Sequence, residues 1–253
     1  MARDALASAA TLENAPTPMT RGMVRMRKAA ASSLLVLLLG TGSCTSGDGD
    51  GKETTADEPS TCEQLLGAAG VEWVKNSAKE KTGVASDSED LKSARSLFYG
   101  YAKAWDPKST QIPTFSNSEL CRVVKTSGAT TNKNLSIYYG ASIVPFDFSV
   151  DEKAGAQGTK TATPVNADVK LVHAKRKNGS GKYYIYVKCR ISGAPAGQEN
   201  EVPIEGVMHD TLTGDTDARV HMKYLLHSAG VVARSFDCQN NPKVPAEPPI
   251  AVK

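Results

Sequence analysis

His209, Asp210, Asp215 and Asp217 lie close together in the C-terminal third of the chain, and their side chains could do chemistry. Carboxylates at this spacing can hold Ca²⁺, and a His beside an Asp can act as an acid and base pair. The alternative is a polar loop between a strand and a helix, in which Asp217 caps the helix. Because no GxSxG, SxxK, HExxH or phosphate-binding glycine loop occurs, we assign no catalytic residue, cofactor or metal ligand.

Two further histidines fall on the helix expected after this loop. His221 and His227 are six residues apart, which places them about 240° apart around a helix axis. Two ligands of one metal ion must point to the same side of the helix. This pair is therefore not expected to form a metal site.

A second group of candidate residues lies in the strand predicted from Tyr183 to Ile191. Its odd positions are apolar, whereas its even positions carry side chains that could stack on a ligand or attract an anion. These are Tyr184, Tyr186, Lys188 and Arg190. The face could bind an anionic polymer or an acidic partner. The alternatives are a solvated face or a face covered by another element.

Cysteine usage indicates an oxidising compartment. After Cys44, which is discussed below, four cysteines remain and no CxxC pair occurs, a pattern that favours two disulfides over metal or redox chemistry. Three pairings are possible, and four buried thiols are the alternative. We expect Cys62 to pair with Cys121 and Cys189 with Cys238, because each bond then joins a helix end to a strand in its own half of the domain.

Helices and strands follow one another in a simple order. The capping box that starts at Ser60 predicts a helix to about Lys81, and a second box at Ser86–Glu89 predicts another that stops at Asp106-Pro107. A final helix is expected from Asp217 to Cys238. The β-prone runs between them are Arg122–Lys125, Leu135–Val144, Phe146–Val150, Val169–Lys175, Tyr183–Ile191 and Val202–His209, with a hairpin turn at Asn178–Gly181 and a loose loop over Ala154–Asn166. This order predicts an α+β fold, with two N-terminal helices and one C-terminal helix on one face of an antiparallel sheet.

The net charge lies entirely in the N-terminal segment. Of 30 basic and 27 acidic residues, five and two precede Cys44, so the remainder of the chain balances at 25 of each. This balance excludes a strongly basic nucleic-acid binder. The segment RGMVRMRKAAASSLLVLLLGTGSC has a basic region, an apolar run of 11 residues and small residues before Cys44, which is the layout of a secretory signal.

This segment resembles bacterial lipoprotein signal peptides, in which a Cys receives a diacylglyceryl group and becomes the new N-terminus. The family usually has Leu three positions before the Cys, where this chain has Thr41. The resemblance implies that Cys44 is lipidated and carries palmitate or a similar acyl chain, that residues 1–43 are removed, and that translation starts at Met23 or Met26. Ordinary secretion and an uncleaved anchor are the alternatives.

A second resemblance covers most of the remaining chain. CEQLL, YYIYVKCRI and LLHSAGVVARSFDCQNNPKVP are similar to segments of actinobacterial secreted lipoproteins of unknown function. These proteins have no established catalytic residues to carry over. The expected organisation is a flexible tether over residues 44–59, one domain over 60–241 and an irregular Pro-rich tail over 242–253.

These observations together predict a lipid-anchored protein on the outer face of the cytoplasmic membrane. Its domain is expected to be a non-enzymatic binding module, with an anionic envelope polymer or a protein as partner and no nucleic acid. The alternative is an envelope hydrolase whose site is assembled from distant residues around His209 and Asp210.

Overall fold

The computed structural model describes residues 59–78, 82–84, 89–111, 113–125, 133–150, 159–175 and 181–252. All of them belong to one compact unit, Thr54–Lys253. The predicted signal, Cys44 and most of the tether lie outside the described residues, as do 176–180 with the predicted hairpin turn. No helix among the described residues is long and apolar enough to cross a membrane.

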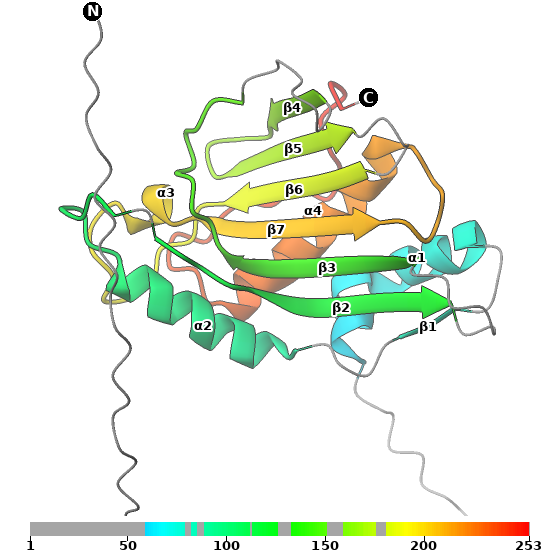
Figure 1. Ribbon diagram of the computed structural model, residues 1–253, viewed down its shortest axis with the longest axis horizontal. Helices are drawn as coiled ribbons and strands as arrows, with labels where there is room; N and C mark the ends of the chain where they lie inside the picture. Colours follow the sequence, from blue (N-terminus) through cyan, green and yellow to red (C-terminus); the bar gives the residue numbers. More distant parts are fainter. Residues whose placement is uncertain are drawn as a thin grey trace, which may run out of the picture. The chain divides into compact units, whose positions relative to one another are not determined.

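Seven antiparallel strands form one sheet in the order β1-β2-β3-β7-β6-β5-β4 (Figure 1). The central position is held by β7, which pairs with β3 on one side and with β6 on the other. The order places the C-terminal strand between the two halves of the sheet. The strands span Thr82–Val84 (β1), Asn117–Lys125 (β2), Asn134–Ala141 (β3), Thr159–Pro164 (β4), Val169–Lys175 (β5), Gly181–Val187 (β6) and Ile204–Asp210 (β7).

The helices are Thr61–Ala78 (α1), Leu91–Ala104 (α2), Gln198–Glu201 (α3) and Ala218–Ser235 (α4). Helix α4 packs on β6 and β7, α1 packs mainly on α4, and α2 packs on β2 and β3. Figure 1 shows α4 and α1 behind the sheet. The predicted α+β class with an antiparallel sheet is therefore confirmed, with the short α3 as an additional helix.

The ends of the helices follow the capping chemistry of the sequence. The capping box of α1 forms as predicted, with the Ser60 N–H donating to Glu63 Oε2 at 2.9 Å and the Glu63 N–H donating to Ser60 Oγ at 3.3 Å. Helix α2 is instead capped by Asp90, whose carboxylate accepts from the Ser93 N–H at 2.6 Å. Helix α4 is capped by Asp217, which accepts from the Arg219 N–H at 2.8 Å.

One core lies between the sheet and the helices, and Tyr139 joins the two layers. Its hydroxyl lies 2.6 Å from the hydroxyl of Ser228 on α4, and burial raises the pKa of Tyr139. The ring lies against Gly206 in the neighbouring strand, where an added Cβ would overlap it. Glycine at this position therefore makes room for the aromatic ring at the centre of the sheet.

The two disulfides are those expected from the sequence. Cys62 at the start of α1 is bonded to Cys121 in β2, and Cys189 after β6 is bonded to Cys238 after α4. The paired Cα atoms are 4.7 and 4.9 Å apart, which is within the usual range for disulfides. Each bond ties a helix of the second layer to a strand or strand end.

Several segments differ from the prediction: β1 was not expected, β2 begins before the predicted run, and two further differences concern residues 146–166. Part of the expected loop Ala154–Asn166 forms β4, which pairs with β5 along its whole length. Its Thr residues have high β propensity but give no apolar pattern, and Pro164 is tolerated because the strand is at the edge. The run Phe146–Val150 is not a strand, because Pro145 and a turn at residues 146–147 lead its side chains over the sheet.

Residues 242–252 contain no helix or strand, as expected for a Pro-rich segment, but they pack on the domain. Val252 is buried, and the carbonyl of Pro249 accepts a hydrogen bond from Arg219 Nη1 at 3.0 Å. Lys223 on α4 forms an ion pair with Glu247. The C-terminal segment is thus attached to α4 at several points.

Candidate functional site

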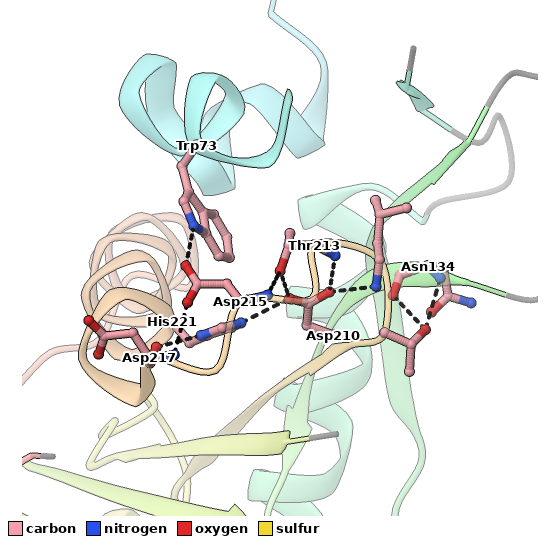
Figure 2. A network of polar contacts seen from close by, with 9 residues as sticks. Trp73, Asn134, Asp210, Thr213, Asp215, Asp217 and His221 are labelled. Atoms are coloured by element: carbon pink, nitrogen blue, oxygen red, sulfur yellow. Dashed lines mark hydrogen bonds and ion pairs between the residues drawn. The ribbon is translucent and has the colours of Figure 1, made fainter. Parts of the chain in front are cut away.

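The main polar cluster of the domain is centred on a buried pair, Asp210 and His221. His221 Nε2 lies 2.9 Å from Asp210 Oδ2, and the two side chains are 0% and 3% exposed. Asp210 ends β7 and His221 lies in the first turn of α4, so the short connection between strand and helix brings them together (Figure 2). The pair therefore joins the centre of the sheet to the helix that crosses it.

Both ring nitrogens of His221 face oxygen acceptors. While Nε2 points to Asp210, Nδ1 lies 2.7 Å from the backbone carbonyl oxygen of Asp217. A neutral imidazole has one N–H, so it could donate only one of these hydrogen bonds. Both contacts can be hydrogen bonds donated by the ring at the same time only when both ring nitrogens carry a proton, and in that form the contact with Asp210 is a buried ion pair.

Asp210 is held by hydrogen bonds to both of its carboxylate oxygens. Oδ1 accepts from the backbone N–H groups of Leu212 and Thr213 at 2.7 and 3.0 Å, and Oδ2 accepts from the Thr213 hydroxyl as well as from His221. Burial alone would raise the pKa of Asp210, but the hydrogen bonds from His221 and Thr213 outweigh it and lower the pKa. The carboxylate is therefore kept ionised by its partners.

Aromatic rings surround the imidazole of His221. Tyr183 from β6 stacks on it with centroids 4.2 Å apart, and Trp73 from α1 meets it edge-on at 5.0 Å. The Trp73 indole N–H donates to Asp215 Oδ2 at 3.0 Å, so Asp215 fixes the ring that covers the pair (Figure 2). Burial, followed by the nearby charges of Asp210, Asp215 and Asp217, raises the pKa of Tyr183 to about 12.

The loop from β7 to α4 is also fastened to the neighbouring strand. The Asn134 N–H donates to the Thr211 hydroxyl at 3.0 Å, and the Thr211 N–H donates to the Asn134 carbonyl oxygen at 2.9 Å. The loop is thus held by β3, α1 and α4 together. This arrangement is that of a structural network that fixes α4 on the sheet.

The four residues of the predicted acidic cluster, His209, Asp210, Asp215 and Asp217, do not form one site and have different structural roles. His209 and Asp210 are neighbours in a strand and so point to opposite faces of the sheet. Asp215 holds Trp73, and Asp217 caps α4, which is the polar-loop alternative weighed from the sequence. Among the described residues, no group of three or more His, Cys, Asp or Glu side chains is arranged to hold a metal ion.

Sequence reasoning missed the role of His221. It compared His221 only with His227, whose Nε2 lies 3.3 Å from the carbonyl oxygen of Gln64 in α1. The available signal was an Asp at the end of a predicted strand and a His in the first turn of the next helix. A short connection places two such residues side by side.

The predicted binding residues do not form one exposed surface. Tyr184 and Tyr186 share a face of β6, but Tyr186 is only 6% exposed and donates a hydrogen bond to Glu205 at 2.9 Å. Burial, followed by the charge of Glu205, raises the pKa of Tyr186. Because β6 ends at Val187, Lys188 and Arg190 lie beyond the strand.

Residues 144–150 cover this face of the sheet. Phe146 and Phe148 pack with Tyr186 and Val172 in a second apolar cluster that contains no helical residue. Lys188 places its ammonium group 4.6 Å from the Phe146 ring centroid, and Arg190 forms an ion pair with Glu199 near 2.5 Å. The face is therefore covered by another element, as in one of the alternatives weighed from the sequence.

Several hollows line the surface that the described residues form. One of about 570 Å³ lies beside the end of α4, and one of about 470 Å³ lies beside the end of α2 with Tyr101, Trp105 and Phe115 in its wall. A third, of about 270 Å³, lies between β4, β5 and the C-terminal segment and includes His173. Their sizes suit small molecules or single groups of a polymer.

Comparison of the chain with protein-family models, with curated proteins and with solved structures found no match. The functional conclusion therefore depends on the residues and geometry described above.

Proposed function

We propose that this protein is a cell-envelope lipoprotein, anchored through lipid on Cys44 to the outer face of the cytoplasmic membrane, with a folded domain that binds an envelope component. The observation that carries the proposal is the pair of disulfides, Cys62–Cys121 and Cys189–Cys238. Such bonds form and persist outside the cytoplasm. They agree with the export signal expected before Cys44.

A binding role has more support than catalysis. The strongest acid and base pair, Asp210 and His221, is enclosed by protein, and the hydrogen bonds of both residues are used within the fold. A catalytic acid or base must reach the proton it moves. The alternative hydrolase would need His209 and Asp210 to act together from opposite faces of β7.

The resemblance to actinobacterial secreted lipoproteins belongs to the same proposal. It rests on the sequence segments around Cys62, Cys189 and Cys238 and on the signal-like segment before Cys44. A host with lipoprotein-processing enzymes is accordingly the suitable place to test export.

Export is tested by labelling intact cells that produce the full chain with a lysine-reactive biotin reagent that does not cross membranes. We expect the protein to be labelled and to fractionate with the membrane. A Leu37→Lys variant, which interrupts the apolar run, should be protected in intact cells and labelled after lysis. Protection of the unchanged protein in intact cells would overturn the envelope location.

Binding is tested separately by sedimenting isolated cell-wall material with the full chain purified in detergent. We expect the folded protein to sediment with the wall and the reduced, denatured protein to lose this binding. If neither the wall nor any component of an envelope extract is retained by the folded protein, the binding role fails.

A further inference from the structure

The hollow of about 570 Å³ lies where α4 ends and the chain turns into its C-terminal segment. Its wall is formed by the last turns of the helix, from Gly230 to Arg234, and by residues of the following segment from Asp237 to Val244. Gly230 lies in this wall close to both parts of it, since a Cβ there would make ordinary contacts with Arg234 Nη1 at 3.5 Å and with Val244 at 4.0 Å.

The backbone around this hollow is fixed at several points. Cys238 is bonded to Cys189, and the Asn240 side chain donates to the carbonyl of Lys188 and accepts from the N–H of Arg190, each at 2.9 Å. On the far side, Asn166 Nδ2 donates to the carbonyl of Lys243 at 2.7 Å. The wall is therefore preorganised, which lowers the entropic cost of binding.

The backbone conformation is also unusual here. Asp237 and Asn241, with φ angles of 54° and 45°, are the only non-glycine residues with positive φ in the described part of the chain. Both line the hollow. Asp237 follows the end of α4, where a left-handed residue is common, but Asn241 does not. Conformations of this kind often gather at binding sites.

Two cationic side chains line the hollow without a partner. Within the described residues, neither the Arg234 guanidinium nor the Lys243 ammonium forms an ion pair or a side-chain hydrogen bond. The carboxylate in the wall, Asp237, is already approached by Arg95 Nη2 from α2 at 3.5 Å. The wall therefore carries two cationic side chains that form no ion pair with a described residue and one carboxylate that faces Arg95.

We propose that this hollow binds an oxyanion, a phosphate or carboxylate group carried by an anionic envelope polymer. Arg234 suits the two oxygens of such a group, and Lys243 adds a compact positive charge. The polymeric source rests on the proposed function, whereas recognition of the oxyanion rests on the hollow alone. This site is separate from the covered face of β6.

The test is calorimetric titration of the full chain, purified in detergent, with linear polyphosphate, polyglutamate and inorganic phosphate. We expect a polymer to bind and the double variant Arg234→Gln/Lys243→Gln to weaken binding at least about tenfold, because each lost charge-assisted hydrogen bond removes substantial affinity. The matched control Lys92→Gln/Lys108→Gln removes two exposed charges elsewhere and should change the Kd less than about twofold.

The three ligands distinguish the chemical group that the hollow binds and its source. Tighter polyphosphate than polyglutamate binding identifies a phosphate site, and the reverse identifies a carboxylate site. Inorganic phosphate could bind as tightly as the polymers and be weakened to the same degree by the Arg234→Gln/Lys243→Gln variant. That result supports the oxyanion site but contradicts a polymer as its ligand. Equal loss in both double variants, or no binding of any probe at low salt, overturns the site. Because export is measured independently in cells, a failure of export would leave this result standing.

Discussion

His221 Nε2 lies 2.9 Å from Asp210 Oδ2, at the point where the central strand β7 passes into helix α4. The two residues are enclosed by Tyr183 and Trp73 and make hydrogen bonds only within the protein. A buried ion pair is not by itself a large source of stability, because both charges lose their hydration. Replacing one member of the pair leaves the other buried without its partner. The resulting loss in the free energy of unfolding measures how strongly the pair holds α4 on the sheet.

Asp210→Asn is expected to lower the free energy of unfolding by about 3 kcal/mol. The Asn side chain would place an N–H₂ group among donors and would leave His221 without its carboxylate. Denaturant unfolding measures this change. The control is Asp217→Asn, the same chemical change at the N-cap of α4, where Asn caps as well as Asp and the expected change is below about 0.5 kcal/mol. Equal effects of both substitutions would contradict the structural role of the pair.

The same pair predicts how stability depends on pH. In the folded protein the pKa of Asp210 is lowered from its usual 3.8, so its stabilising contribution is present above about pH 4 and is lost as the pH falls through the folded value. Measured from pH 5 to pH 3, the unfolding free energy should fall more steeply for the unchanged protein than for the double variant Asp210→Asn/His221→Gln, in which both members of the pair are replaced. Other carboxylates titrate in both proteins, so the difference reports the contribution of Asp210. Parallel curves would show that Asp210 makes no such contribution.

The two disulfides should contribute similarly to stability. They close loops of 59 and 49 residues, for which the chain-entropy model gives about 4 kcal/mol each. Replacing either pair by Ala should lower the thermal unfolding temperature by comparable amounts, and reduction of the unchanged protein should approach the sum. Peptide mapping without reductant should recover the two pairs described here. Recovery of a crossed pairing would contradict the arrangement of α1 and α4 on the sheet.

Lys170 is expected to hold the covering segment 144–150 on the sheet. Its ammonium group donates to the carbonyl oxygens of Phe146 and Phe148 and lies 4.5 Å from the Phe148 ring centroid. Burial lowers the pKa of Lys170. Lys170→Met should therefore speed hydrogen exchange in residues 144–150, whereas Lys188→Met, which removes a contact with the Phe146 ring but no hydrogen bond to this segment, should have a smaller effect. Unchanged exchange in the Lys170 variant would show that apolar packing alone holds the segment.

The sequence patterns were sufficient where the signal is local. Helix α4 was predicted from its apolar spacing and from Asp217, and β5 was predicted with its observed bounds, because each element carries its own periodicity. Cysteine positions also indicated the pairing, since each bond joins elements that the predicted order places near one another. The helix and strand signals depend on neighbours in the chain, and the disulfide pairing followed from the order of those elements.

Features that depend on distant residues were not predictable in this way. Strand β4 has no apolar pattern, and it forms because its backbone can pair with the edge of β5. Tyr186 is covered by a segment about 40 residues earlier in the chain, which no periodicity reveals. The hollow beside Arg234 and Lys243 depends on a helix end, a disulfide and the C-terminal segment together.

The central claim is lipid anchoring of an exported domain, and metabolic labelling with palmitate tests it most directly. The full chain and its Cys44→Ser variant are produced in a bacterial host with lipoprotein-processing enzymes and compared after immunoprecipitation. We expect the unchanged protein to incorporate label and the variant to incorporate none, because a serine hydroxyl cannot form the thioether to the diacylglyceryl group. Equal labelling of the two proteins, or no labelling of the unchanged protein, would contradict the proposal.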